Sequence, residues 1–250
     1  MGAQTVDRAC AILKEVARAG AEGARMIDLC HATGLSRPTA HRILLSLIAA
    51  GFVRQESASR RYSLGRALFE IGLAAPSPIE SYPEVTHLLY ELAHDTQDTT
   101  YLMMRSNDDV VCAGRGEGAY PIKANIVSPG DRRPMAGSAA GLSLLAALDP
   151  HEADAIVRRS GPSLARYCRL SEDDARACID AARRNAYILV ENLVMDGVTA
   201  VGMAIPSRHA RAYLAISVSA IASRITPQRV PELVASLEYT ARRIAAIVGS

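Results

Sequence analysis

Residues 34–53 read GLSRPTAHRILLSLIAAGFV, and this stretch decides the fold of the N-terminal part of the chain. Ser36 is a favoured helix N-cap, and Pro38 lies in the first turn, where its missing N–H is not needed. The apolar residues that follow have helical spacing, and they are Ala40, Ile43, Leu44, Leu47 and Ile48. The sequence therefore predicts an amphipathic helix that ends near Gly51 and shows polar side chains at its N-terminal end.

Two helices are expected before this stretch and a hairpin after it. Apolar residues with helical spacing predict the first helix, and they are Ala9, Ile12, Leu13, Val16 and Ala17. A second helix is predicted over about 26–33, where Gly34 is placed to end it. After Gly51 the pattern becomes strand-like, with short strands at 52–55 and 60–64 around a polar turn. Helix, helix, turn, helix and hairpin together describe a winged helix-turn-helix domain.

The arginines of this region are concentrated where such a domain meets DNA. Between Ser36 and Arg66 the chain holds six arginines and one acidic residue, Glu56. In a helix-turn-helix the second helix enters the major groove, and basic residues of a wing contact the DNA backbone or the minor groove. The predicted DNA-binding residues are Ser36, Arg37, Thr39, His41, Arg42, Arg60 and Arg61. A dimerisation unit is the alternative, because a Leu-rich helix with a basic hairpin also suits that role.

The rest of the chain has a mixed pattern. A helix is predicted at about 65–75, and Pro76-Ser77-Pro78 is the expected domain joint. Beyond it we expect strands at 100–104, 110–113, 121–127, 187–191, 198–205 and 213–219, and helices at 84–96, 138–148, 151–159, 171–185 and 230–248. Strands in hairpin-like pairs, flanked by helices, favour an antiparallel α+β domain.

One predicted strand has a face suited to a small ligand. On the strand at 213–219, alternation places Ala215, Ser217 and Ser219 on one face. Small residues leave room there, and hydroxyl groups can form hydrogen bonds with a ligand. Ser138, which opens a helix after Gly137, adds backbone N–H groups that suit a carboxylate. Alternatively, these serines satisfy neighbouring backbone groups in a tightly packed sheet.

Several other classes of protein find no support. The five cysteines are odd in number and form no CxxC pair, so we expect no disulfide framework, no metal site and a cytoplasmic location. No signal peptide and no run of about 18 apolar residues is present. The histidines are scattered, and neither HExxH nor GxSxG occurs, so we expect neither an enzyme nor a cofactor.

Two features of the sequence bear on enzyme functions. The run Gly114-Arg115-Gly116-Glu117-Gly118 suggests a nucleotide loop, but the GxGxxG form is incomplete, and a hairpin turn is the prediction. A methyltransferase with a winged-helix dimerisation domain would need a Gly-rich loop after the strand at 100–104. Residues 105–109 read RSNDD instead. A protein adaptor that does not bind DNA would leave the exposed arginines without a role, and a redox function for Cys112 is less expected than simple burial.

The sequence motifs resemble those of the IclR-type transcriptional regulators. The resemblance rests on GLSRPTAHRIL at 34–44, GFV at 51–53 and RYSLG at 61–65. It continues with GDRRPM at 130–135, AAG at 139–141, LLA at 144–146 and AISVS at 215–219. These segments span nearly the whole chain in the family's order.

This resemblance implies an α+β protein with three parts: a winged helix-turn-helix domain at 1–65, a linker helix at 66–80 and a GAF-like effector-binding and oligomerisation domain at 81–250. It implies a dimer or tetramer on operator DNA, controlled by a small metabolite. The implied effector-binding residues are Asn125, Arg133, Met135, Ala139, Ala140, Ser217 and Ser219.

Two departures from the family pattern make the expected pocket less polar. Where many relatives have consecutive acidic residues, this chain has Val190-Glu191-Asn192, and where a cysteine is common it has Ala200. We therefore expect a larger or more apolar effector, such as an aromatic acid, with Arg133 as the partner of its carboxylate.

Overall fold

The computed structural model describes residues 4–74, 83–207 and 212–248. The chain divides into two compact units, residues 1–77 and residues 78–250. Each unit has its own buried core, so each is described separately.

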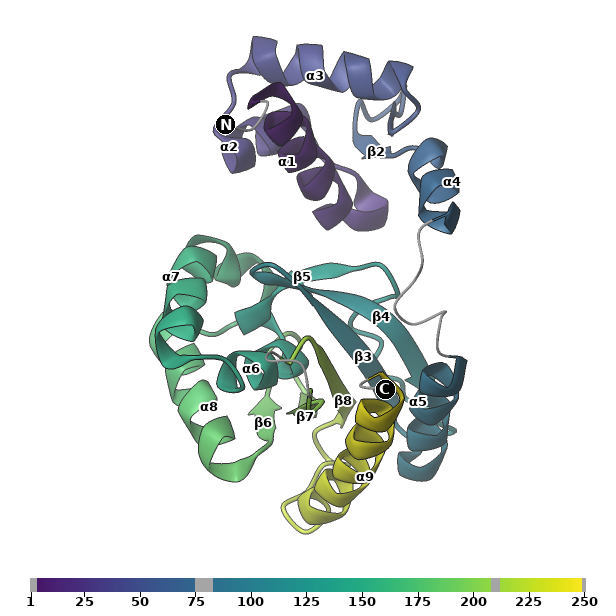
Figure 1. Ribbon diagram of the computed structural model, residues 1–250, viewed down its shortest axis with the longest axis vertical. Coiled ribbons are helices and arrows are strands. Elements are labelled where there is room, and N and C mark those ends of the chain that lie inside the picture. Colours follow the sequence, from purple (N-terminus) through teal and green to yellow (C-terminus); the bar gives the residue numbers. More distant parts are fainter. Residues whose placement is uncertain (1–3, 75–82, 208–211, 249–250) are drawn as a thin grey trace. The chain divides into compact units, whose positions relative to one another are not determined.

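The described part of the first unit contains four α-helices and a two-stranded hairpin (Figure 1). Its elements are α1 (Gln4–Arg18), the short 3₁₀ helix η1 (Gly20–Glu22), α2 (Met26–Thr33), α3 (Arg37–Ala49), β1 (Val53–Gln55), β2 (Tyr62–Leu64) and α4 (Arg66–Ala74). Gly34 has a φ of 66°, a left-handed conformation that glycine adopts readily, and it ends α2 just before α3 begins. Helix, helix, turn, helix and hairpin are thus confirmed.

The core of this unit comes mainly from the apolar stripes of α1, α2 and α3. Ile12 of α1, Leu29 of α2 and Leu44 of α3 are fully buried in one cluster. The hairpin joins this core through Tyr62, which forms two 2.8 Å backbone hydrogen bonds with Ala24, just before α2. These contacts fix the hairpin relative to α2 and α3.

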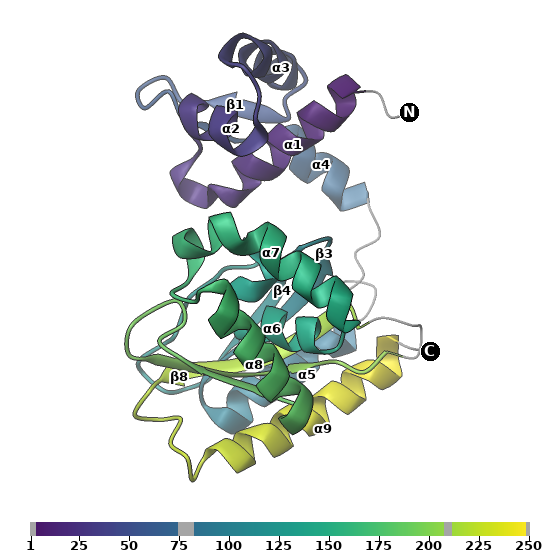
Figure 2. The same cartoon turned by 90° about the vertical axis from the view of Figure 1, so that its left-hand side faces the viewer.

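The second unit is a six-stranded antiparallel sheet with helices on both faces (Figure 2). The strand order is β5-β4-β3-β8-β7-β6, and every neighbouring pair is antiparallel. The strands are β3 (Thr99–Ser106), β4 (Asp109–Glu117), β5 (Arg132–Pro134), β6 (Ile188–Glu191), β7 (Val198–Ala204) and β8 (Leu214–Ile221). Helices α5 (Pro83–Thr96) and α9 (Val230–Val248) cover one face, and α6 (Ala139–Ala146), α7 (Pro150–Tyr167) and α8 (Glu172–Asn185) lie on the other.

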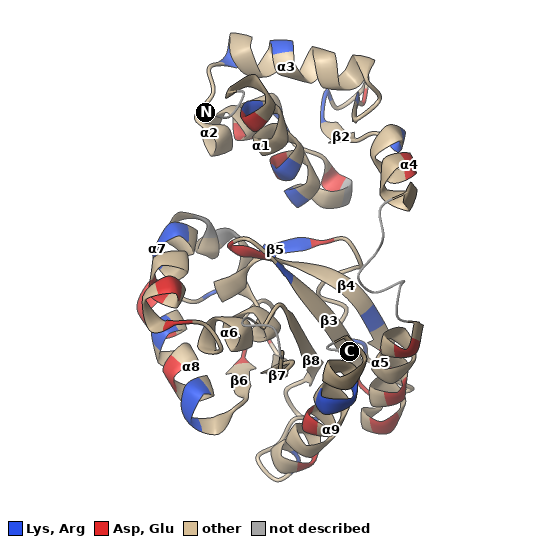
Figure 3. Cartoon of the chain, viewed as in Figure 1, with Lys and Arg blue, Asp and Glu red and all other residues tan. Residues whose placement is uncertain are grey.

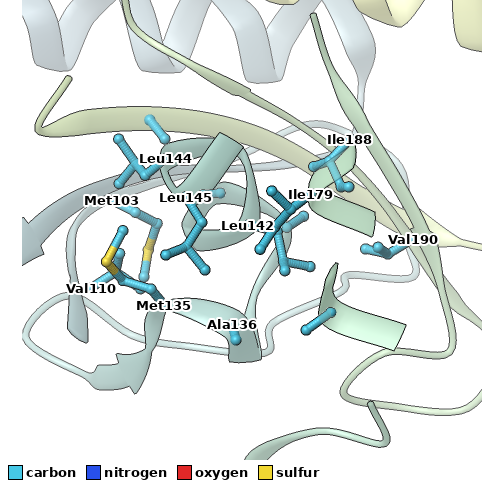
Figure 4. Packing of buried hydrophobic residues seen from close by; sticks show 14 of the residues in the cluster. Met103, Val110, Met135, Ala136, Leu142, Leu144, Leu145, Ile179, Ile188 and Val190 are labelled. Carbon is cyan, nitrogen blue, oxygen red and sulfur yellow. The ribbon is translucent and has the colours of Figure 1, made fainter. Parts of the chain in front are cut away.

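Strand β8 lies in the middle of the sheet and serves both faces. Leu214, Ile216 and Val218 pack with α5 and α9, while Ala215 joins the opposite core. That opposite core is built around α6, whose Leu142, Leu144 and Leu145 are completely buried (Figure 4). The alternation predicted for this strand is confirmed.

A buried carboxylate connects the start of β3 to the loop before α9. The Asp98 side chain is 1% exposed and accepts from Arg224 Nε at 2.6 Å and from Arg229 Nη1 at 2.7 Å. The Arg224 guanidinium also lies 3.8 Å from the centre of the Tyr120 ring. A buried charge needs such partners, so the loss of either arginine would destabilise this part of the second unit.

One strand prediction and one turn prediction for this unit are wrong, and helix α7 extends past its predicted end near 159, to Tyr167. Residues 121–127 form no strand. The Tyr101 hydroxyl donates to the Ala124 carbonyl and accepts from the Ile126 N–H, so a side chain forms the hydrogen bonds that a neighbouring strand would otherwise form. The run at 114–118 is not a hairpin turn, since most of it is the second half of β4. Gly116 is needed there for close packing: a Cβ would lie 2.6 Å from Thr100 Oγ1 and 2.9 Å from the Leu89 carbonyl oxygen.

Candidate functional site

A groove runs along the first unit between α2, α3 and the hairpin. Eleven residues from all three elements line it: Arg25, Met26, Ile27, Cys30, Arg37, Pro38, His41, Gln55, Ser59, Arg60 and Tyr62. Among the described residues, no Asp or Glu lines this groove. Three arginines facing one concave surface give it a positive potential, which suits a polyanion.

Three of the seven predicted DNA-binding residues line this groove. Arg37 and His41 come from the first turns of α3, and Arg60 comes from the tip of the hairpin. Arg42 is exposed further along α3 and does not line the groove. Figure 3 shows basic residues along the N-terminal half of α3. The N-terminal end of α3 is therefore open to solvent.

The other three residues are occupied by local contacts. The hydroxyls of Ser36 and Thr39 lie 2.9 Å apart, and Ser36 occupies the N-cap position without a side-chain hydrogen bond to the helix backbone. Arg61 Nη1 donates to the Gly23 carbonyl at 2.8 Å. Arg61 thus helps to hold the hairpin against the loop before α2.

The tip of the hairpin is held in a defined shape. Arg60 has a φ of 56°, in the left-handed region, and its N–H donates to the Glu56 carbonyl at 2.9 Å. Gln55 Nε2 donates to the Arg60 carbonyl at 3.0 Å, and Ser59 Oγ donates to Glu56 Oε2 at 2.6 Å. These contacts present the Arg60 side chain at the rim of the groove.

A second concavity lies in the other unit, between the sheet and the start of α6. It is lined by Tyr101, Met103, Ile126, Val127, Arg133, Gly137, Ser138, Ala139, Ala140, Val190, Leu193, Val194, Val198, Ala200, Ser217 and Ser219. The space open to the centre of a water molecule measures about 50 Å³. Most of the lining is apolar, as is usual for sites that bind small organic molecules.

Five of the seven predicted effector-binding residues line this cavity, namely Arg133, Ala139, Ala140, Ser217 and Ser219. The other two do not. Asn125 is exposed, and its Nδ2 lies 3.3 Å from Glu117 Oε1. Met135 is completely buried and packs in the core near Met103 and Val110 (Figure 4).

The polar groups of the cavity are few. Ser217 and Ser219 are only 5% and 4% exposed, and among the described residues neither hydroxyl has a hydrogen-bond partner. Arg133 lies 5.2 Å from the centre of the Tyr167 ring, and its Nη2 is 3.4 Å from the Ile126 carbonyl oxygen. Both hydroxyls line the cavity and can form hydrogen bonds with a molecule that enters it.

Sequence reasoning missed most of the cavity walls and part of the groove. Tyr101, Leu193 and Val194 line the cavity, but apolar residues on neighbouring strands and loops look like ordinary core residues. Arg25 and Gln55 line the groove without belonging to its central helix. No local pattern marks these residues, because only the folded chain brings their segments together.

Other chemistry has little support in the described part of the chain. Burial raises the pKa of the Cys112 thiol to about 12, which leaves it protonated and unreactive at neutral pH. Within residues 4–74, 83–207 and 212–248, no cluster of His, Cys, Asp and Glu is suited to a metal ion. Among the helices that the structure describes, none has the length and apolar character needed to cross a membrane.

Comparison with known proteins matches both units to one family. Residues 5–57 match the IclR helix-turn-helix domain, and residues 82–246 match the family described as Bacterial transcriptional regulator IclR C-terminal. The chain is 25% identical over 260 residues to the acetate operon repressor of Salmonella typhimurium, covering 98% of this chain and 90% of that one.

Solved structures share the fold. The IclR transcriptional regulator from Alicyclobacillus acidocaldarius superposes with a TM-score of 0.75 at 24% identity, covering 100% of both chains. An IclR homolog from Microbacterium hydrocarbonoxydans, complexed with 4-hydroxybenzoate, gives a TM-score of 0.68 at 18% identity, covering 98% of both chains. With the family match over most of its length, this chain belongs to the IclR family of bacterial DNA-binding transcriptional regulators.

Proposed function

We propose that this regulator reads operator DNA with the first turns of α3 and that a small, largely apolar carboxylic acid controls it. The observation that carries the DNA-binding part is the acid-free groove, in which Arg37 and His41 of α3 face Arg60 of the hairpin. A major groove admits one α-helix, and arginine pairs with guanine through two hydrogen bonds. Arg37 and Arg42 would read bases, while Arg60 would contact phosphates as part of the wing.

The cavity of the second unit supports the effector part of the proposal. Its apolar walls suit a hydrocarbon or aromatic body, and Arg133 offers a cation for a carboxylate. The hydroxyls of Ser217 and Ser219 would donate hydrogen bonds to the same ligand. The 4-hydroxybenzoate held by the Microbacterium homolog is an acid of this class.

The size of the cavity suggests how a ligand would act. A volume of about 50 Å³ is about a third of that of a cavity known to hold benzene. An aromatic acid would therefore have to displace wall residues such as Leu193 and Val194, which lie just after β6. We propose that this displacement distinguishes the ligand-bound protein from the ligand-free one.

We further propose that the protein binds DNA as a dimer or tetramer, with α4 as a contact between copies and as the start of the linker helix at 66–80. Residues 75–80 of that linker lie outside the described residues. None of the nine described residues of α4 is buried, although Phe69, Ile71 and Leu73 are large and apolar. A helix that shows apolar side chains to solvent needs a partner, and a second copy would place two α3 helices on one duplex.

We also propose that the protein acts as a regulator without catalysis, cofactor or metal. It would act in the cytoplasm, where operator DNA is found. The match of both units to transcriptional regulators supports it. We propose the domain limits 1–65, 66–80 and 81–250 for the same reason.

The experiment is a binding screen with the full chain. Duplex fragments of the source genome are titrated at modest ionic strength, and the best fragment is then titrated with a panel of aliphatic and aromatic acids. We expect nanomolar affinity for at least one fragment, and a change of about 5- to 150-fold when the correct acid is added.

A matched pair of variants links the ligand response to the cavity. Ala200→Leu fills a lining position, and Ala165→Leu adds the same bulk at an exposed position of α7. The first should keep DNA binding and lose the response, and the second should keep both. A folded wild-type protein that binds every fragment equally weakly would contradict the proposal.

A further inference from the structure

Arg25 is a basic residue of the groove to which the helix-turn-helix pattern assigns no role. It lies directly before α2 and lines the same concave surface as Arg37 and Arg60. Its side chain is 60% exposed, so it can reach a bound molecule. Its guanidinium faces Asp28 in the first turn of α2, with Nε 2.9 Å from Oδ2 and Nη2 3.1 Å from Oδ1.

The place of Arg25 in the fold selects phosphate rather than base as its target. In a helix-turn-helix the second helix enters the groove, while the first helix crosses the DNA backbone. Arg25 precedes the first helix of the pair, and α3 supplies Arg37 and His41 on the other side of the groove. A duplex seated on α3 would therefore bring a backbone phosphate, which carries no sequence information, to Arg25.

Asp28 occupies the two donor positions that such a phosphate would need. Arginine binds carboxylate and phosphate with the same two-pronged geometry, so one guanidinium cannot serve both through the same edge. The Asp28 side chain is 38% exposed, and exposed ion pairs are weak enough to be exchanged.

We propose that Arg25 binds a backbone phosphate of DNA and that Asp28 competes for it, which lowers the affinity for DNA of every sequence. This inference rests on the proposed mode of DNA binding. Its consequence is improved selectivity. Backbone contacts supply most of the non-specific affinity, so a carboxylate that weakens one of them favours the sites at which α3 also reads bases.

The test compares salt dependence in four variants of the full chain. Fluorescence anisotropy measures binding to the best genomic fragment and to a scrambled duplex of equal length, between about 50 and 200 mM salt. The variants are Arg25→Ala, Asp28→Asn, the double variant with both changes, and Lys14→Ala. Lys14 is exposed on α1 and does not line the groove, so its variant controls for the loss of one positive charge.

We expect Arg25→Ala to weaken binding to both duplexes by the same factor. The decrease of log K with log salt should become less steep by about 0.9. Asp28→Asn should increase the affinity for both duplexes. The increase should be smaller when the same change is made in a protein that already carries Arg25→Ala. Lys14→Ala should keep the wild-type slope. An unchanged slope in Arg25→Ala, or no gain in Asp28→Asn, while the wild type still binds the genomic fragment, would overturn this inference and leave the proposed function standing. Failure of the wild type to bind any fragment would instead overturn the proposed function.

Discussion

Ser143, Ser217 and Ser219 are buried in the second unit, but they differ in whether their hydroxyls have hydrogen-bond partners. Ser143 of α6 donates to the carbonyls of Ala139 and Ala140, at 3.1 and 2.9 Å. Ser217 and Ser219 of β8 are buried as deeply, yet their hydroxyls have no partner among the described residues. A buried hydroxyl without a partner costs folding free energy, and one with a partner contributes to it. We therefore propose that the Ser217 and Ser219 hydroxyls are available to a ligand, whereas the Ser143 hydroxyl serves the fold.

Replacing these serines by alanine should therefore give opposite results. We expect Ser217→Ala and Ser219→Ala to leave the free energy of unfolding unchanged or raise it by about 1 kcal/mol, and Ser143→Ala to lower it by about 1 kcal/mol. Urea unfolding checks these values. The first two variants should bind the acid found in the screen at least about fivefold more weakly, because each loses one hydrogen bond.

The Ser143 variant is the matched control for ligand binding and should keep the wild-type affinity in calorimetry. Equal destabilisation by all three changes, with unaltered ligand affinity, would show that the β8 hydroxyls serve the fold alone.

The cavity residues could be predicted where one segment supplies them. Ser217 and Ser219 follow from strand alternation, and Ala139 and Ala140 were expected from the resemblance at the start of α6. Met135 was expected to line the cavity, but the turn before α6 directs it into the core. Asn125 was misjudged because 121–127 is irregular, and its side chain contacts Glu117 instead. Sequence pattern gives the face of a regular element and does not give the course of a loop.

Among the elements, α4 is the helix that packs least within its own unit. Phe69 is 67% exposed, Ile71 56% and Leu73 68%. Such exposure disfavours an isolated monomer, since apolar side chains gain free energy when they leave water. Within one copy, Arg66 and Glu70 of α4 form an ion pair of 2.9 Å.

We expect the double variant Phe69→Glu/Leu73→Glu to dissociate at concentrations where the wild type is dimeric, because each charge would be buried in the contact. Sedimentation velocity measures this, and the affinity for a two-site operator should fall with the dimer. Ile122→Glu, at a residue that is 54% exposed in the second unit, should sediment as the wild type does. A variant of α4 that sediments unchanged would exclude this helix as the contact.

The regular elements were largely predictable, and the errors have physical causes. The apolar periodicity of α3 and the alternation of β8 are strong signals that tertiary packing reinforces. Helix α7 was expected to end near 159, before Gly161 and Pro162, but it continues to Tyr167. The complete burial of Leu164 in the core offsets the cost of a proline within the helix. Such compensation depends on distant residues.

For the whole molecule, the account joins two units with different tasks. The first presents α3 and the hairpin around a basic groove, and the second holds an apolar cavity lined by Arg133 and the two serines of β8. Coupling between them requires that the ligand favour one of two states that differ in DNA affinity. Family membership gives the general role of both units, whereas the residues proposed to perform it are tested by the variants described here.

The most direct test of the central claim is the affinity of the double variant Arg37→Ala/Arg42→Ala for the best genomic fragment. The account predicts a loss of at least about 30-fold, because each arginine that reads a base edge contributes about 1–3 kcal/mol, with a smaller loss on a scrambled duplex. A circular dichroism spectrum and an unfolding midpoint equal to those of the wild type would show that the variant is folded. A folded double variant with full affinity for the genomic fragment would contradict the assignment of α3 as the recognition helix.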